Sequence, residues 1–308
     1  MAKPFISSGR PFKKMEGDVV ASTVAVCSDQ GGWSSAHAEW LRKPGKAALV
    51  REFMDKQMAE EAHSLWVAQS QKESEYGYPE GWHLKPLDVQ AAILKEYFPG
   101  LDTSHVHELA GRYMRDGRLD LPEGMDGLAV IPKLSPIAYH LEAPRCFGEE
   151  WPVYNRAMRR LLEVMGKAIP NFRDLSHGQV SKRQLRRDEK TVKSYEAMSD
   201  LPGEVMVLAV QTGLRYRGKS PEYVWDLLEE GEFGLDAFAV GCIILTHPER
   251  LVSRDDLAID CPGSVLYPEG RMCGVPCWSF HDGEVRFNLH HLDHASAYYG
   301  SASTRLPK

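Results

Sequence analysis

The sequence lacks the segments that place a chain in a membrane or outside the cell. Its longest apolar run, 237–245, is far shorter than the roughly 20 residues that a transmembrane helix needs. Residues 1–17 carry charges but no apolar stretch, so we expect no signal peptide. Six cysteines in 308 residues are too few for a secreted disulfide framework. The sequence therefore predicts a cytoplasmic protein with reduced thiols and no membrane partner.

Two common catalytic signatures are also missing. The chain contains neither Gly-x-Ser-x-Gly, the nucleophile turn of many hydrolases, nor His-Glu-x-x-His, a metalloprotease motif. Its net charge of −6 means that any affinity for nucleic acid has to come from a local basic patch. With 43% hydrophobic and 26% charged residues, the composition is typical of soluble globular proteins. Binding, hydrolytic and structural roles all remain open.

Apolar residues recur at helical spacing in some stretches and at strand spacing in others. Helices are predicted over 34–41, 46–70, 86–97 and 152–167, and strands over 19–26, 128–131 and 204–212. The run 237–245 is a buried element, either strand or helix. We predict an α+β protein with a mostly helical part over 1–145. The part over 149–308 would hold a small mixed sheet, flanking helices and a terminal β-hairpin; the alternative is one continuous domain.

The stretch 204–230 reads as a buried strand, a loop bounded by glycines and a helix N-terminus. The loop over 213–220, called the glycine loop below, matches Gly-x-x-x-x-Gly-Lys-Ser, the pattern that wraps a nucleotide phosphate. Asp260 follows an apolar strand and is a candidate for the acid on the magnesium side. Against this interpretation, the loop interior is bulky where backbone has to approach phosphate. A solvated or salt-bridged loop is the alternative.

The glycine loop also predicts simple anion binding, without nucleotide chemistry. A cationic loop before a helix N-terminus is a place where an anion is favoured. The residues predicted to contact it are Arg215, Arg217, Gly218, Lys219 and Ser220.

A charged helix is predicted over 181–198. At 3.6 residues per turn, its basic side chains fall within roughly 140° of one another; they are Lys182, Arg183, Arg186, Arg187, Lys190 and Lys193. The opposite side is apolar, so one face would pack on the core and the other would meet an anionic partner such as an RNA or DNA backbone. A solvated face with acidic neighbours is the alternative.

The spacing Cys273-x3-Cys277-x12-His290-x3-His294 satisfies the two-cysteine, two-histidine zinc pattern. A zinc finger would need a helix that carries both histidines. The alternation of apolar residues over 284–289 indicates a strand instead, which argues against a finger.

A zinc site based on a hairpin avoids this objection. With Asp282-Gly283 as a two-residue turn, Cys277 lies across from Asn288, and the four ligands meet at the open end. Four such ligands would close a tetrahedral zinc site. The alternative is a reduced cysteine pair with surface histidines.

Three C-terminal segments carry a resemblance. They read Leu-Thr-His-Pro-Glu-Arg-Leu over 245–251, Leu-Ala-Ile-Asp-Cys over 257–261 and Tyr-Gly-Ser-Ala-Ser over 299–303. They resemble segments of an uncharacterised family of bacterial hypothetical proteins with no assigned function. The resemblance covers the C-terminal half and implies no activity, cofactor or site.

The leading hypothesis from the sequence is a non-catalytic protein that binds a phosphate-bearing partner, most naturally nucleic acid, through the basic helix and the glycine loop. One alternative is a nucleotide- or metal-dependent hydrolase. The other is a structural or interaction protein in which the motif matches are accidental.

Overall fold

The computed structural model describes residues 40, 43, 46–139, 152–178, 180, 184–267 and 272–306. By its packing the chain divides into two units, Met1–Trp66 and Val67–Lys308. The predicted strand 19–26 lies outside the described residues, and of the predicted helix 34–41 only residue 40 is described, as helical.

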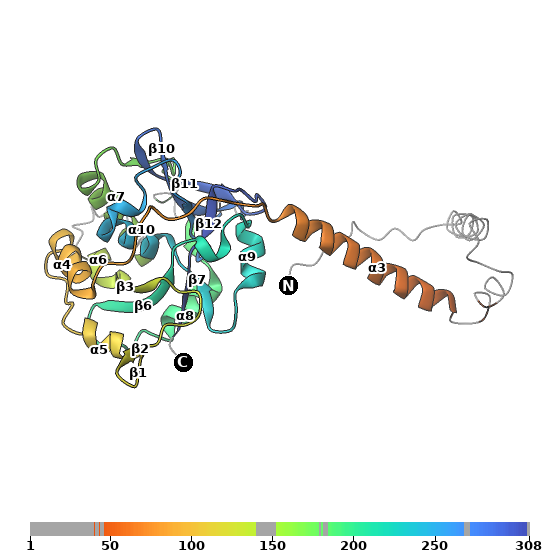
Figure 1. Ribbon diagram of the computed structural model, residues 1–308, viewed down its shortest axis with the longest axis horizontal. Coiled ribbons are helices and arrows are strands. Elements are labelled where there is room, and N and C mark those ends of the chain that lie inside the picture. Colours follow the sequence, from red (N-terminus) through yellow and green to blue (C-terminus); the bar gives the residue numbers. More distant parts are fainter. Residues whose placement is uncertain are drawn as a thin grey trace. The chain divides into compact units, whose positions relative to one another are not determined.

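The long predicted helix is confirmed as α3 (Lys46–Gln69) (Figure 1), which begins in the first unit and ends in the second. Its apolar stripe is exposed: the relative exposure is 62% for Phe53, 63% for Met58 and 58% for Leu65. In the part of the chain that is described, no helix is both long and apolar enough to cross a bilayer.

A four-stranded antiparallel sheet forms part of the second unit. Its strand order is β3 (Gly127–Pro132), β6 (Val205–Gln211), β13 (Ser303–Arg305) and β7 (Glu232–Gly234). All seven residues of β6 are buried, as predicted for a strand covered on both faces. Because β3 pairs with β6 along its whole length, residues from both halves of the chain build this sheet.

A second, mixed sheet contains the hairpin. Its strands are β12 (Tyr299–Ser301), β8 (Ala258–Asp260), β10 (Gly274–His281), β11 (Glu284–His291) and β4 (Arg173–Asp174), with β9 (Ser264–Leu266) and β5 (Leu185–Arg187) attached through β10. After β12 the chain passes through the buried Ala302 and enters β13. The two sheets are therefore joined covalently at that residue.

The apolar run 237–245 is a helix, α10 (Ala237–Thr246), and all ten of its residues are buried. Its N-cap is Asp236, whose carboxylate accepts the N–H of Ala239 at 2.7 Å. The helix contacts β3 of one sheet and β10 of the other. Gly241 permits this packing, because a Cβ there would lie 2.7 Å from the Trp278 ring.

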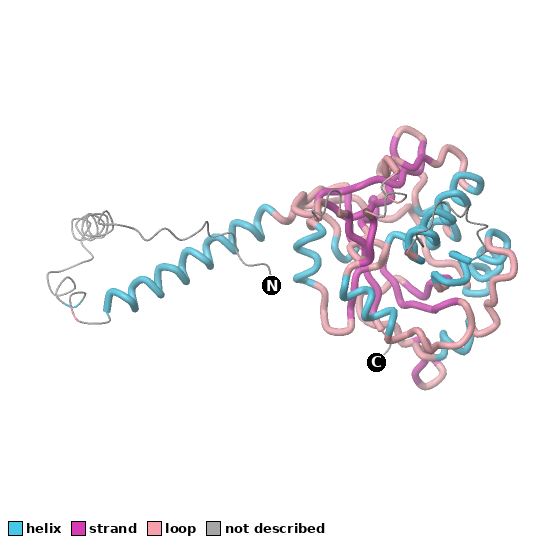
Figure 2. The backbone as a smooth tube through the Cα atoms, turned by 180° about the vertical axis from the view of Figure 1, so that it is seen from behind, coloured by secondary structure: helices cyan, strands magenta, loops and turns pink. Residues whose placement is uncertain are grey.

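The remaining helices flank the strands on either side (Figure 2). They are α4 (Leu87–Tyr97), α5 (Val106–Gly111), α6 (Leu134–Tyr139), α7 (Val153–Ala168), α8 (Glu189–Glu196) and α9 (Pro221–Leu227). Short 3₁₀ turns η1 (Leu214–Tyr216) and η2 (Pro248–Arg250) and a small hairpin of β1 (Met114–Arg115) and β2 (Arg118–Leu119) complete the described elements. The protein has a mixed α+β fold, as the sequence predicts.

Candidate functional site

The predicted basic helix over 181–198 is wrong as a single element. Residues 185–187 form strand β5, which pairs with β9, and helix α8 begins only at Glu189. The helix starts there because the Asp188 carboxylate accepts the N–H groups of Lys190 (2.9 Å) and Thr191 (3.4 Å). Side chains alternate along a strand, so Arg186 and Arg187 project from opposite faces.

Arg187 is part of the protein core. Its Nε donates to Oδ2 of the buried Asp236 at 2.5 Å. Its guanidinium carbon lies 4.3 Å from the ring centroid of Tyr195 and 5.1 Å from that of Tyr154. A guanidinium held between two rings and a carboxylate stabilises the start of α10 and is not available to a nucleic acid.

The other described basic residues of this stretch are divided between strand β5 and helix α8. Arg186 is exposed and lies over the ring of Tyr267, 5.2 Å from its centroid. On α8, Lys193 pairs with Glu189 at 2.6 Å, and Lys190 is exposed. Arg183 lies outside the described residues.

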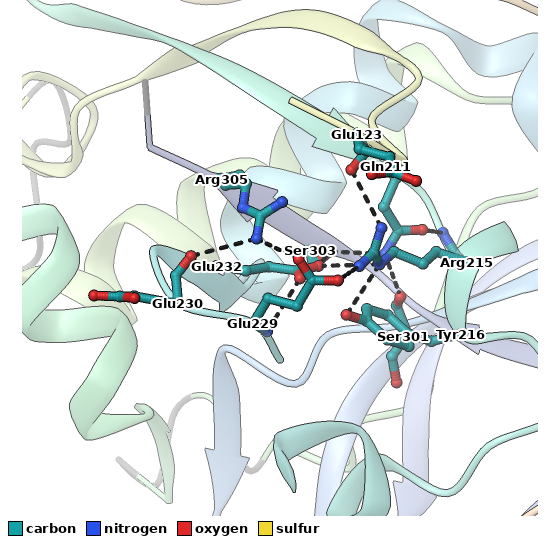
Figure 3. A network of polar contacts seen from close by, with 11 residues as sticks. Glu123, Gln211, Arg215, Tyr216, Glu229, Glu230, Glu232, Ser301, Ser303 and Arg305 are labelled. Atoms are coloured by element: carbon teal, nitrogen blue, oxygen red, sulfur yellow. Dashed lines mark hydrogen bonds and ion pairs between the residues drawn. The ribbon is translucent and has the colours of Figure 1, made fainter. Parts of the chain in front are cut away.

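Arg215, at the start of the glycine loop, belongs to a network of polar contacts (Figure 3). Its Nη2 pairs with Glu229, and its Nε lies 3.8 Å from Oε1 of the fully buried Glu232. Arg305 pairs with Glu229 from the other side, and Nη1 of Arg215 donates to the carbonyl oxygen of Glu123 at 3.2 Å. Acidic partners therefore already neutralise Arg215.

The donors of the glycine loop that would hold a phosphate are used inside the protein. The N–H of Gly218 donates to the carbonyl oxygen of Tyr299 at 2.8 Å, and the N–H of Ser220 to that of Ser70 at 2.8 Å. The Ser220 hydroxyl accepts the N–H of Tyr223 at 3.4 Å, as the N-cap of α9. In this conformation these groups offer no cradle to a nucleotide phosphate.

Both glycines of the loop are explained by close packing of the backbone. Gly213 has φ +120° and Gly218 has φ +74°, values that disfavour residues with a Cβ. A Cβ on Gly218 would overlap the carbonyl oxygen of Lys72, and one on Gly213 would lie 2.9 Å from that of Gly300. The glycine spacing thus fits two neighbouring chain segments.

The predicted hairpin register is confirmed. Asp282 (φ +53°) and Gly283 (φ +79°) form the turn, and Cys277 pairs with Asn288. Cys277 also pairs with Asp260 of β8 on its other side. Residues paired directly across strands share a face, and so do residues two apart, which places His290 of β11 on the same face as Asp260.

A line of hydrogen bonds runs from the interior to the surface on this face. Asp260 is fully buried, and its Oδ2 lies 2.9 Å from Nδ1 of His290. Nε2 of His290 lies 3.2 Å from Nδ1 of His294, which is exposed. The ring of Tyr299 stacks on that of His290, with centroids 4.3 Å apart and planes at 17°. The carboxylate fixes the tautomer of His290, and each ring orients the next.

The two histidines differ in protonation. Burial lowers the pKa of His290, but the charge and the hydrogen bond of Asp260 outweigh it and raise that pKa above its ordinary value. Burial and the charges of His290 and Lys72 lower the pKa of His294. The pair therefore takes its first proton on His290, and above the pKa of His290 both rings are neutral.

The cysteines of the zinc pattern are neutral thiols in this structure. Burial raises the pKa of the Cys277 thiol well above its ordinary value, and burial also raises that of Cys273. Within the described ranges, no three histidine, cysteine, aspartate or glutamate side chains are grouped so as to hold a metal ion. The zinc site of Cys273, Cys277, His290 and His294 stays a prediction.

The glycine loop and the histidine pair meet at β12. Arg217 forms an isolated β-bridge with Gly300, and the N–H of Lys72 donates to the carbonyl oxygen of Gly218 at 2.7 Å. Lys72 is close enough for its charge to act on His294. The second half of the loop, residues 217–219, is therefore brought beside the C-terminal histidines. Arg187, Lys193 and Arg215 make the separate contacts described above.

Three residues of this site escaped the sequence analysis. Asp260 was considered only as a magnesium ligand, and Lys72 and Tyr299 carried no motif. The sequence signals for these residues were indirect: Asp260 follows an apolar strand, and Asp260 and Tyr299 lie in segments that carry the resemblance. Comparison with protein-family models, with curated proteins and with solved structures found no match for this chain.

Proposed function

We propose that the protein is an acid–base enzyme that acts on a phosphate-bearing substrate, with His294 as the general base. The observation that carries this proposal is the hydrogen-bonded line Asp260–His290–His294, which is buried at one end and exposed at the other. A purely structural histidine pair has no need of a buried carboxylate that fixes its tautomer and raises its basicity. A surface that only binds anions has no need of it either.

The arrangement assigns each proton. The base acts when both rings are neutral, above the raised pKa of His290. Asp260 then accepts the Nδ1–H of His290, and Nε2 of His290 accepts the Nδ1–H of His294, so the free lone pair is on Nε2 of His294. That atom takes a proton from an attacking water or hydroxyl as the new oxygen–phosphorus bond forms. The bond to the leaving oxygen breaks, and this oxygen takes a proton from solvent. The His294 proton returns to solvent, and His290 and Asp260 stabilise the intervening positive charge.

The charges around the pair support an anionic substrate. Among the residues that the structure describes, no carboxylate lies within ion-pair distance of Lys72, Arg217 or Lys219. Arg215 at the other end of the loop is paired. An ammonium group beside a general base stabilises the negative charge that develops on phosphoryl oxygens.

The test is hydrolysis of a nitrophenyl phosphodiester and of labelled single-stranded RNA and DNA by the full chain. We expect His294→Ala to lower kcat/KM by about 100-fold or more, because a general base contributes about 10²–10⁴ in rate. His107→Ala is the matched control, since His107 is also exposed and also contacts a carboxylate, that of Asp88 at 2.7 Å. Absence of turnover, or turnover that His294→Ala leaves unchanged, contradicts the proposal.

A metal site at the same histidines is the second candidate. Two ligand atoms of a tetrahedral zinc ion, each about 2.0–2.1 Å from the metal, lie about 3.3 Å apart. The observed separation between Nε2 of His290 and Nδ1 of His294 is 3.2 Å. A carboxylate that accepts the other ring N–H of a histidine, as Asp260 does, is the usual partner of a metal ligand. Asp293 is a further candidate, since its charge raises the pKa of both histidines.

Metal analysis of protein purified without added metal separates the two candidates. A zinc site gives about one zinc per chain. If only the histidines hold the metal, His290→Ala loses it and Cys273→Ser keeps it. If the four-ligand pattern holds it, both variants lose it. Protein that carries no metal and still hydrolyses the phosphodiester excludes the metal site and leaves the acid–base enzyme.

A further inference from the structure

We propose that the surface beside the histidine pair binds single-stranded nucleic acid, with one base stacked on Tyr298 and a neighbouring phosphate held by Arg217. This inference rests on the proposed function, because it names the substrate class of the same site. It is carried by a pair of aromatic rings of which Tyr298 is exposed, by the segment that joins these rings to the histidines and by the Arg217 guanidinium, which has no carboxylate partner among the described residues.

The aromatic pair consists of Tyr76 and Tyr298. Their ring centroids are 4.6 Å apart with planes at 54°, and Tyr298 is 48% exposed. A hydrogen bond between the two side chains raises the pKa of Tyr76 and fixes the rings relative to each other. A ring held in place with one side open is the kind of surface on which a nucleobase stacks.

The chain places this pair next to the proposed catalytic group. Tyr298 directly precedes Tyr299, whose ring stacks on His290. On the other side, the segment from Lys72 to Tyr76 runs from the histidine pair to the aromatic pair. It is fixed midway, where the Ser74 hydroxyl donates to the carbonyl oxygen of Ala297 at 2.5 Å. Four residues span at most about 14 Å. The histidine end and the aromatic end of this segment can therefore contact the same extended nucleic-acid strand.

Arg217 supplies a cation at the aromatic end. Its Nη1 donates to the carbonyl oxygen of Tyr76 at 3.3 Å, and the side chain is exposed. This single hydrogen bond ties the guanidinium to the backbone of Tyr76 and leaves most of its N–H groups for an acceptor such as a phosphate oxygen. Arg254 and Asp255 also act on Tyr76, with opposite effects on its pKa, so their charges largely offset each other here.

The geometry favours a single strand over a duplex. In a duplex each base is already stacked and its faces are covered, so an exposed tyrosine has no ring to pair with. In a single strand the bases can turn out. A stacked base and a held phosphate would then bring the next phosphodiester toward Lys72 and His294.

The test is fluorescence anisotropy with a labelled deoxythymidine oligonucleotide, the matching RNA and the same DNA as a duplex. It uses the wild-type chain and His294→Ala, at about 50 mM salt, where phosphate contacts are strongest. We expect both single strands to bind more tightly than the duplex. Tyr298→Ala should weaken their binding about 10-fold or more, and Tyr298→Trp should preserve it, because a stacked base needs a ring and not a hydroxyl.

The guanidinium has its own readout. Arg217→Ala should reduce the slope of log affinity against log salt by about 0.7, the value for one phosphate contact on a single strand. Arg118→Ala, on the distant hairpin strand β2, is the control and should leave both affinity and slope unchanged.

The outcomes separate this inference from the proposed function. The stacking surface is contradicted by equal binding of single strand and duplex, by no binding at all, or by unchanged affinity in Tyr298→Ala. The proposed enzymatic function is still supported in that case if turnover of the small phosphodiester depends on His294. Binding that depends on Tyr298 without any turnover supports the stacking surface and contradicts the proposed enzymatic function.

Discussion

Arg187 and Arg217 show how much the surroundings of one residue decide. Both are arginines that the sequence assigned to anion binding. Arg187 lies between two rings and donates to the buried Asp236, whereas Arg217 is exposed and makes one hydrogen bond to a carbonyl group. The same side chain thus completes the core in one place and remains open to a ligand in the other.

Replacing Arg187 by methionine should destabilise the fold by about 3–5 kcal/mol, because it leaves the Asp236 carboxylate buried without a partner. Arg186→Met, one residue away but exposed, should cost less than about 1 kcal/mol. Chemical denaturation of both variants measures the difference. A loss in Arg187→Met no larger than in Arg186→Met would show that the ion pair does not hold the start of α10. Adding Asp236→Asn to Arg187→Met should recover part of the loss.

Asp260 should control the pKa of His290. In the wild type the charge and the hydrogen bond of Asp260 raise the pKa of His290 against burial. In Asp260→Asn burial is opposed only by the smaller effect of Asp293, so the pKa should fall below the ordinary value of about 6.5. In the wild type, His290 contributes stability that is fully present below that ordinary value and is lost as pH rises through its raised pKa. In Asp260→Asn the sign reverses, and lowering the pH should destabilise the fold. NMR titration of the histidine ring protons measures both pKa values, with His290→Gln to assign the signal.

At the scale of elements, glycines set where the chain can turn and approach itself. Gly283 provides the left-handed residue that closes the β10–β11 hairpin, and Gly218 lets the glycine loop lie against the carbonyl oxygen of Lys72. Gly166 is not required by a turn or by a close contact. It lies in α7, and a Cβ there would meet only Phe172, at 3.9 Å. Three glycines that look alike in the sequence therefore differ in what they contribute.

Alanine substitutions should reveal this difference. Gly283→Ala should cost about 1–2 kcal/mol, because an alanine is strained in the left-handed region. Gly218→Ala should cost more, since strain adds to overlap with backbone. Gly166→Ala should stabilise the protein by about 0.5–1 kcal/mol, because alanine favours a helix. Denaturant midpoints provide the measurement. An unchanged midpoint in Gly218→Ala would contradict close packing against Lys72 as the reason for this glycine.

At the scale of the whole molecule, the strands of both sheets lie in the second unit. The segment that follows Trp66 is bound to it by backbone hydrogen bonds: Ser220 donates to Ser70, Lys72 donates to Gly218, and Leu257 donates to Gly77. Both sheets, α10 and the histidine pair lie in the same unit, Val67–Lys308. This unit contains everything that the proposed function needs.

A chain of residues 67–308 should therefore fold by itself, with a thermal midpoint within about 2 °C of the full chain, a shift that corresponds to about 1 kcal/mol for a chain of this length. A shorter chain that begins at Leu87 is the control. It loses the hydrogen bonds of the 70–77 segment and should unfold at a clearly lower temperature. Calorimetry of the three chains provides the comparison, and a 67–308 chain without a cooperative transition would show that residues before Val67 are needed for the fold.

The sequence by itself determined the features that depend on neighbours along the chain. Helical spacing predicted α3, α4 and α7, the apolar run with valines predicted the buried β6, and Asp282-Gly283 fixed the register of β10 against β11. These succeed because helix periodicity, burial on both faces and two-residue turns are local properties of backbone and side chains. The α+β class follows from them.

Only the tertiary structure decided the features that depend on distant partners. Residues 185–187 have a helical charge pattern, yet they form a strand because β9 offers an edge with which to pair and Asp188 caps the next helix. The glycine loop has the letters of a phosphate site, yet its donors are taken by Tyr299 and Ser70. Asp260 contacts His290 because their strands, β8 and β11, both pair with β10, although the two residues are 30 positions apart in the sequence. A local pattern indicates which contacts a side chain is able to make. The long-range pairing of strands determines which of these contacts form.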